Sequence, residues 1–351
     1  MRFLSHSIIA GRNVKIVKPL FLNILYTIAG EPMLLDMTEF LHHAIMAFSG
    51  HNTQPWKFRV KENLILIYPD LSRRLPAVDP LDRKLYISLG CVLENLVIAA
   101  GHEGYRTLVG YSFQNGAISV NLEPADGKID DDRLFNAIPI KQSTRRQYDG
   151  RSITEADVER LASLPLEQGV SALFVANPEK IERVIGLVKE GNNIQMNDRN
   201  FIQELVSLIR FNEAEANRYR DGLSSKAMGN PSLSRIIGKL FMKFFLDAKG
   251  QLKKDEKYIR SSSALMIVLP EKNDRDSWIK TGRSFERLAL CATILGIKNA
   301  HTNQPCEVPE LKKKLQKLLS AGNMHPQLLL RLGYAEPLSK SLRRSVSEVI
   351  I

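Results

Sequence analysis

A short polar loop holds the residues whose types and spacing are best suited to chemistry. Its hydrogen-bonding side chains are those of Ser49, His51, Asn52 and Gln54. The loop follows an apolar, helix-like stretch at 37–48, and Pro55 and Trp56 close it and restrict its backbone. Packed so closely, these donors and acceptors could face the edge of a heteroaromatic ring, with Trp56 either contacting the ring or anchoring the loop in the core.

Two basic segments further along the chain carry residues suited to a phosphate group. The first supplies Lys141, Ser143 and Arg145, and the second supplies Arg343 and Arg344. A phosphate dianion requires fixed hydrogen-bond donors and positive charge, and these side chains offer both. Adjacent arginines also occur as solvated surface pairs, so that alternative stays open for Arg344, and for Arg146 beside Arg145.

Together these segments resemble the signatures of the nitroreductase-like flavoprotein family. The loop at 49–56 reads S-x-x-N-x-Q-P-W, similar to the family's flavin-contacting loop. Residues 141–148 resemble its basic R-x-S-x-[RK]-x-[FY] opening, with Lys141 in place of Arg and Tyr148 one residue late. The tail at 332–349 resembles its closing L-G-Y-P strand end and basic segment, so the similarity spans 36–351. One departure in the loop is Phe48, which stands where the family commonly has proline.

The resemblance implies a cofactor, a reaction and a role for each site residue. FMN would be the bound cofactor and NAD(P)H its reductant, with a nitroaromatic, a quinone or a similar small molecule as electron acceptor. No side chain acts as a nucleophile, because the flavin performs the chemistry. The ring would be positioned by Ser49, His51, Asn52, Gln54 and Trp56, and the phosphate would be held by Lys141, Ser143 and Arg145 together with Arg343 or Arg344.

In that family, a homodimer builds each flavin site from both subunits. This chain carries the loop in its first half and the phosphate grip in its second, so it resembles the tandem, Acg-like subgroup, in which one polypeptide mimics the dimer. One site per chain is expected, in a monomeric pseudo-dimer or a homodimer. The competing interpretation is a protein that binds or sequesters FMN without reductase turnover, with the flavin shielded by a lid.

A gapless internal match supports the duplication independently of the family. Residues 90–104 align with 282–296 at a constant offset of 192, with five identities in fifteen positions. Apolar residues recur at three- and four-residue steps in both copies, and a glycine ends each, which predicts two amphipathic helices with glycine C-caps. Strand-like runs flank both copies, at 63–68 and 106–111 and at 264–269 and 297–301.

We therefore predict an α+β fold of two tandem nitroreductase-like α/β-sandwich halves that form an intramolecular pseudo-dimer. The halves are expected at 36–138 and 139–351, after an N-terminal arm at 1–35. An insertion at about 205–258 has no counterpart in the first half. It would serve as a lid over the site or as a helix pair covering a sheet edge.

The composition restricts the remaining function classes. The formal net charge is +11, but no zinc-finger spacing, RNP motif or basic heptad region accompanies it, so no nucleic-acid partner is expected. Three scattered cysteines predict a reducing, cytoplasmic setting and not a disulfide scaffold. In the arm at 1–35, Lys15 and Lys18 interrupt the apolar runs; a secretory or membrane-surface segment is the minority alternative.

Overall fold

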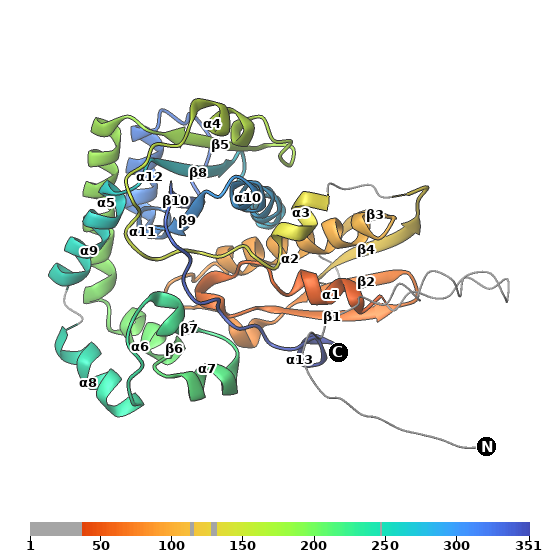
Figure 1. Ribbon diagram of the computed structural model, residues 1–351, viewed down its shortest axis with the longest axis horizontal. Helices are drawn as coiled ribbons and strands as arrows, with labels where there is room; N and C mark the ends of the chain where they lie inside the picture. The colour runs from red at the N-terminus through yellow and green to blue at the C-terminus, as the bar shows by residue number, and fades with distance from the viewer. Residues whose placement is uncertain (1–36, 113–115, 128–131, 246–247) are drawn as a thin grey trace, which may run out of the picture. The chain divides into compact units, whose positions relative to one another are not determined.

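Apolar strands form two four-stranded antiparallel sheets with the same connectivity (Figure 1). The computed structural model describes residues 37–112, 116–127, 132–245 and 248–351. One sheet has the order β1-β2-β4-β3 and the other the order β5-β8-β10-β9, and every pairing in both is antiparallel. The strands are β1 (Trp56–Lys61), β2 (Leu64–Pro69), β3 (Tyr105–Ser112), β4 (Ala117–Pro124), β5 (Val170–Val175), β8 (Ala264–Pro270), β9 (Lys298–His301) and β10 (Leu328–Gly333). Helix and sheet are thus mixed, as predicted.

The two internally matching segments are long helices that pack against each other, α2 (Arg83–His102) and α10 (Arg275–Ile294). At their contact, a Cβ added to Gly90 would lie 1.9 Å from the carbonyl oxygen of Ile279, and one added to Gly282 would lie 1.9 Å from that of Ile87. The glycines and the isoleucines are both 192 residues apart. Each helix therefore touches the other through the same surface, which is the property of a two-fold interface.

The ends of this helix pair also match the expectation from the sequence. Gly104 (φ +82°) and Gly296 (φ +72°) follow the helices in the left-handed region, where an L side chain is strained. The strands predicted on either side of each helix are present as β2, β3, β8 and β9. Helix α2 is long and apolar enough to cross a membrane, but 89% of its most apolar window is buried inside the fold, as in the core helix of a globular protein.

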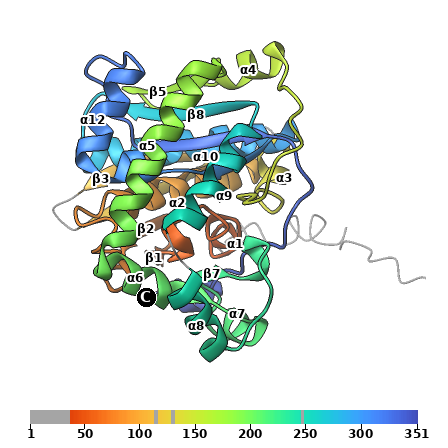
Figure 2. The same cartoon turned by 90° about the vertical axis from the view of Figure 1, so that its left-hand side faces the viewer.

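The two sheets differ most in the connection between their first two strands. Two residues join β1 to β2, whereas residues 176–263 join β5 to β8. By strand topology, the segment without a counterpart is thus longer than the 205–258 expected from the sequence. It contains α5 (Pro178–Asn197), α6 (Arg199–Leu208), α7 (Glu213–Tyr219), α8 (Arg235–Phe245), α9 (Ala248–Arg260) and a short parallel pair, β6 (Ile209–Arg210) and β7 (Leu223–Ser224). Helices α5 and α9 lie side by side (Figure 2).

Short helices connect the remaining elements, and an apolar core lies beneath them. They are α1 (Glu39–Ala44), α3 (Asp132–Ala137), α4 (Glu155–Ala162), α11 (Gln304–Glu307), α12 (Pro309–Leu318) and α13 (Val346–Val349). Helix α1 ends earlier than the apolar stretch at 37–48 suggested.

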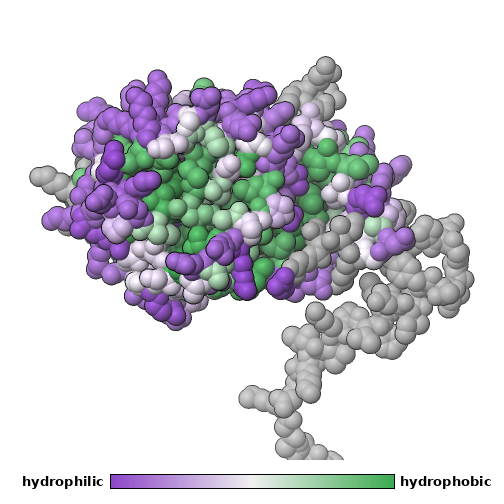
Figure 3. Space-filling model, turned by 90° about the horizontal axis from the view of Figure 1, so that it is seen from above, coloured by the Kyte–Doolittle hydropathy of each residue, from purple (hydrophilic) through white to green (hydrophobic). Residues whose placement is uncertain are grey.

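Seen from above, from the side where α4 and β5 lie in Figure 1, apolar residues gather in the middle of the face within a hydrophilic border (Figure 3). The predicted arm at 1–35 lies outside the described residues.

Candidate functional site

The polar loop before β1 has an unusual backbone. His51, Asn52 and Gln54 all have positive φ, at 48°, 55° and 52°. Such conformations cost about 1–3 kcal/mol each for residues other than glycine, and they persist only where the surroundings hold them. Inside the loop, the backbone N–H of Gln54 donates to Ser49 Oγ at 3.0 Å. The backbone N–H of Gly50 donates to Ser88 Oγ of α2 at 3.3 Å. The strain marks the loop as a functional candidate.

Asn52 joins this loop to two distant parts of the chain. Its Nδ2 donates to the carbonyl oxygens of Gly222, in the inserted segment, and of Leu342, in the C-terminal tail, at 3.1 Å each. Its Oδ1 accepts from Arg343 Nη1 at 2.9 Å. The first and third predicted motifs are therefore in direct contact, and the Asn52 side-chain amide already makes three of its four hydrogen bonds within the protein.

Gln54 makes a parallel set of contacts. Its Nε2 donates to the carbonyl oxygen of Arg220 at 2.8 Å, and its Oε1 accepts from the Arg344 amide at 2.8 Å. The Arg344 guanidinium donates to the carbonyl oxygens of Gln54 and Trp56. Gln54 and Trp56 are fully buried and line neither of the cavities described below. In this structure they shape and anchor the loop.

An outer cavity of about 650 Å³ lies where the loop meets the basic segments. Seven of the ten residues predicted for the site line it: Ser49, Asn52, Lys141, Ser143, Arg145, Arg343 and Arg344. The structure thus brings together residues that are up to 295 positions apart in the chain. Arg344 is 5% exposed and does not form a solvated surface pair with Arg343, whereas Arg146 is exposed.

The cations of the outer cavity are held in different ways. Lys141 Nζ lies 2.5 Å from the carboxylate of Glu286 on α10, and both side chains are buried. Arg343 donates to the carbonyl oxygens of Met46 and Ala47 at 3.3 and 3.2 Å. Burial lowers the pKa of Arg343 to about 10, which still leaves it cationic at neutral pH. An anion entering this cavity would meet fixed donors and positive charge.

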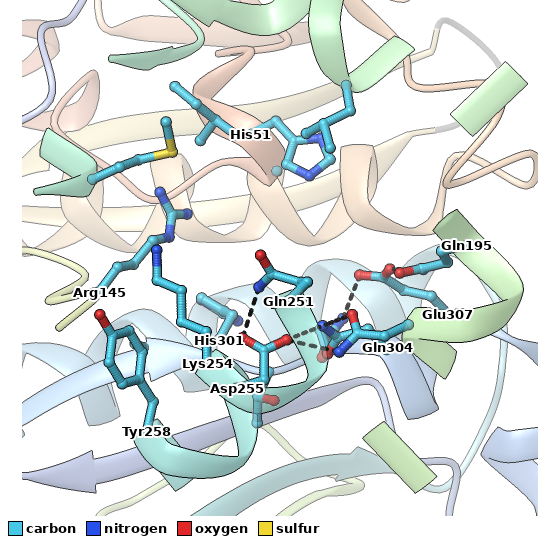
Figure 4. Close-up of a pocket in the computed structure, with 18 of the residues that line it drawn as sticks. His51, Arg145, Gln195, Gln251, Lys254, Asp255, Tyr258, His301, Gln304 and Glu307 are labelled. Atoms are coloured by element: carbon cyan, nitrogen blue, oxygen red, sulfur yellow. Dashed lines mark hydrogen bonds between the residues drawn. The ribbon is translucent and has the colours of Figure 1, made fainter. Parts of the chain in front are cut away.

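An inner cavity of about 330 Å³ adjoins the outer one, and Phe48, Arg145 and Leu223 line both. Figure 4 shows residues that line the inner cavity, among them Arg145 and Glu307. His51 and His301 line the inner cavity. The ring of Phe48 stacks on His301, with centroids 4.2 Å apart. At the far side of the inner cavity Lys84 forms an ion pair with Glu307, and although burial raises the pKa of Glu307, this ammonium lowers it to about 2.

The inner cavity also carries buried polar atoms without a hydrogen-bond partner in the described part of the chain. They are His51 Nδ1, His301 Nε2, Thr302 Oγ1, Gln304 Oε1 and Arg331 Nη1. Burial, followed by the nearby cations, lowers the pKa of both His51 and His301 to about 3, so both imidazoles are neutral near pH 7. A neutral imidazole offers one donor and one acceptor. Unmet polar groups that line a cavity indicate a polar ligand.

Sequence reasoning placed His51 in the site but not His301, Thr302 or the walls contributed by the inserted segment. The stretch at 301–305, His-Thr-Asn-Gln-Pro, nearly repeats the sequence of the polar loop. Asn303 lines the inner cavity and its Oδ1 accepts from the Leu329 amide at 2.8 Å. In the described residues, no group of histidines, cysteines and carboxylates is arranged for a metal ion.

Comparison with known proteins places this geometry in context. The "Putative NAD(P)H nitroreductase Rv3131" of Mycobacterium tuberculosis is 24% identical over 318 residues, which cover 88% of each chain. The "Putative NAD(P)H nitroreductase acg" of the same organism is 22% identical over 315 residues, covering 87% of this chain and 92% of the relative. This chain resembles the nitroreductase-like proteins. The match extends through both sheets, as expected for the tandem subgroup, and it confirms the resemblance drawn from the motifs.

Solved structures of nitroreductases also match, at lower similarity. The FMN-dependent nitroreductase NfnB from Mycobacterium smegmatis, in complex with NADPH, is 12% identical with a TM-score of 0.43, covering 62% of this chain and 96% of that one. A nitroreductase from Bacteroides fragilis with bound FMN is 19% identical with a TM-score of 0.37, covering 60% and 95%. No protein-family model matches the chain.

Proposed function

We propose that this protein is an FMN-dependent NAD(P)H oxidoreductase of the nitroreductase type, which reduces a nitroaromatic, a quinone or a similar small molecule. The observation that carries the proposal is the pair of adjoining cavities, one lined by the predicted phosphate residues and the other by unpaired polar atoms. The nitroreductase names of the relatives support the same reaction class.

The residues present fit FMN on chemical grounds. Ser143, Lys141 and Arg343 provide a hydroxyl and two cations for a phosphate in the outer cavity. Neutral His51 and His301 provide donors and acceptors for the edge of a heteroaromatic ring in the inner cavity. When bound, the flavin supplies hydride transfer, and the protein supplies orientation, a dry surface at Phe48 and fixed dipoles.

The wider organisation belongs to the same proposal. The equal strand orders and the reciprocal glycine contact support two tandem halves that form an intramolecular pseudo-dimer with one site, the second half beginning near residue 139. We propose a cytoplasmic protein in which residues 1–35 form an additional arm. Sedimentation equilibrium would distinguish a monomer from a homodimer.

An anaerobic titration with NADH and NADPH tests the catalytic claim. The protein is first loaded with FMN and freed of unbound flavin, and its visible absorbance is followed. Bleaching of the flavin band, followed by reoxidation with a nitroaromatic or a quinone, supports the oxidoreductase. A protein that neither co-purifies with FMN nor takes it up would refute the proposal.

A second candidate function is FMN binding without turnover, and the inserted segment favours it. Gly222 and Arg220 of that segment accept hydrogen bonds from Asn52 and Gln54, and several of its residues line the inner cavity. A wall fixed in this way would restrict access to a bound ring. Tightly bound flavin that neither reductant bleaches, in a protein that dithionite does reduce, would favour this alternative.

A further inference from the structure

Three cations lie at one end of the inner cavity and come from three distant parts of the chain. Arg145 follows α3, Lys254 belongs to α9 of the inserted segment, and Arg331 belongs to β10; all three line the cavity. The ring of Tyr258 links two of them, because the Arg331 guanidinium carbon lies 5.1 Å and Lys254 Nζ 5.7 Å from its centroid. In Figure 4 Arg145, Lys254 and Tyr258 are drawn on the same side of the cavity.

No carboxylate forms an ion pair with these cations within the described part of the chain. There, the side chains of Arg145 and Lys254 form neither a hydrogen bond nor an ion pair with another residue. Arg331 is only 3% exposed; its Nη2 donates to the carbonyl oxygens of Thr144 and Arg146, while its Nη1 has no partner. Burial, and then the charge of Arg331, lower the pKa of Arg145. Holding the buried charge of Arg331 beside a second cation, Arg145, is unfavourable unless an anion joins them.

The nearest carboxylate is engaged elsewhere. The oxygens of Asp255 accept hydrogen bonds from Asn192 Nδ2 at 2.7 Å, Gln251 Nε2 at 2.8 Å and Gln304 Nε2 at 3.4 Å. Burial raises the pKa of Asp255, while the hydrogen bonds from Asn192 and Gln251 and the charges of Lys254 and Arg331 act in the opposite direction. Among the described residues, it forms no ion pair with the three cations. The charge at this end of the cavity therefore remains available to a ligand.

We propose that Arg145, Lys254 and Arg331 form an oxyanion subsite, which binds a carboxylate or phosphate on a molecule that exchanges electrons with the flavin. The inference rests on the proposed function and adds a substrate class to it. Two sources share this chemistry: a carboxylate on the electron acceptor and a phosphate of the nicotinamide reductant. Lys254 is exposed at the rim of the cavity and lies in the inserted segment. That segment would then select ligands by charge.

Paired ligands that differ in charge test the subsite at equilibrium, without turnover. FMN-loaded protein is titrated by calorimetry with 4-nitrobenzoate and its neutral isostere 4-nitrobenzamide, and with adenosine 2′-monophosphate and adenosine. We expect the anion of at least one pair to bind about tenfold more tightly than its neutral partner, as one charge-assisted hydrogen bond would provide. Preference in the first pair assigns the subsite to the acceptor, and preference in the second assigns it to the reductant.

Two variants make the assignment specific. Lys254→Met should remove about tenfold of the preference for the anion, whereas Lys253→Met, an exposed neighbour on α9 that does not line the cavity, should leave it unchanged. Equal binding within both pairs overturns the subsite. So does a Lys254→Met protein that loses affinity for FMN but not for riboflavin, because the cations would then hold the flavin's own phosphate.

The same titrations separate the subsite from the function on which it rests. The flavin content is measured first, by absorbance. If the protein takes up no FMN, the proposed function fails, and the paired titrations are repeated on the flavin-free protein to decide the subsite by themselves.

Discussion

The central helices α2 and α10 meet through equivalent glycines, yet their buried glutamates serve different purposes. Glu94 of α2 accepts from Arg283 Nε at 3.0 Å and from Arg287 Nε at 2.6 Å, so its charge is satisfied within the helix interface. Glu286 of α10 occupies the matching position, 192 residues later, and binds Lys141 at the outer cavity instead.

The difference follows from the residues that face each carboxylate. At the offset of 192, the positions that carry Arg283 and Arg287 on α10 carry Cys91 and Asn95 on α2. Neither of these supplies a counter-charge, so Glu286 stays available for a cation from outside the helix pair. One symmetric scaffold thus offers two equivalent positions, and the choice of two facing residues decides which one becomes part of a site.

Breaking the reciprocal glycine contact between α2 and α10 should produce the largest loss of unfolding free energy. In Gly90→Ala or Gly282→Ala, the new methyl group would lie 1.9 Å from a backbone oxygen of the opposite helix, so the helices must separate. We expect each variant to lose more than about 4 kcal/mol of unfolding free energy, or to fail to fold. Urea denaturation of soluble variants measures this loss.

The control for this pair is Gly186→Ala in α5, where an added Cβ meets nothing within 4 Å. It should gain about 0.5–1 kcal/mol from helix propensity. A tolerated alanine at either Gly90 or Gly282 would show that the interface does not require the close approach.

The two glutamates provide the sharpest test of the asymmetry. Glu94→Gln should cost about 3 kcal/mol of unfolding free energy with or without FMN, because Arg287 loses its carboxylate and Arg283 keeps only Glu167. Glu286→Gln should cost a similar amount in the flavin-free protein, because Lys141 is buried. Saturating FMN should recover most of that loss, since its phosphate would neutralise Lys141.

Denaturation midpoints with FMN, with riboflavin and with neither ligand test whether the FMN phosphate rescues Glu286→Gln. Riboflavin lacks the phosphate and should not rescue Glu286→Gln. If FMN stabilises the two glutamine variants equally, Glu286 is not coupled to the phosphate site and the comparison fails.

The two sheet-and-helix units contribute one histidine each to the inner cavity, and both should make stability depend on pH. The pKa of His51 and of His301 is about 3 in the folded protein, against an ordinary value of 6.5. Below pH 6.5 both histidines bind protons in the unfolded chain but stay neutral in the folded protein. The free energy of unfolding therefore falls as pH falls towards 3. The expected slope is about 1.4 kcal/mol per pH unit for each histidine.

His301→Phe should retain the stack on Phe48 and reduce this slope by one histidine's share. The measurement is a series of urea denaturations between pH 6.5 and 4.5. An unchanged slope in both His301→Phe and His51→Phe would show that these imidazoles are not held neutral.

The sequence predicted the repeated helices and the polar loop well because both have local causes. Periodic apolar residues with a terminal glycine define a helix such as 90–104 without knowledge of its partner. Through the family resemblance it also named ten site residues, of which seven line the outer cavity. It did not predict that the side-chain amides of Asn52 and Gln54 donate hydrogen bonds to the carbonyl oxygens of Gly222 and Arg220. Such pairing depends on how a distant segment of the chain packs against the loop.

The grouping of the three cations at the inner cavity was likewise not predicted from the sequence. Arg331 lies in an apolar strand run and Lys254 in a charged helix, and neither belongs to a recognisable motif. Only the tertiary fold brings them together, because Arg331 of β10 lies over the ring of Tyr258 of α9, and both elements line the cavity with Arg145. A ligand-binding residue that is defined by tertiary contact, and not by spacing, gives no periodic or local signal in a single sequence.

The smallest change in stability is expected at the glycines that end the two helices. Gly104 and Gly296 both adopt a positive φ, which an alanine tolerates at a cost of about 1 kcal/mol. Gly296→Ala should show this strain alone, because an added Cβ meets nothing within 4 Å. Gly104→Ala should cost slightly more, since its Cβ would approach the Gly127 carbonyl oxygen at 3.4 Å. Thermal unfolding of both variants tests this order; a reversed order would show that the two helix ends are less alike than their backbone angles indicate.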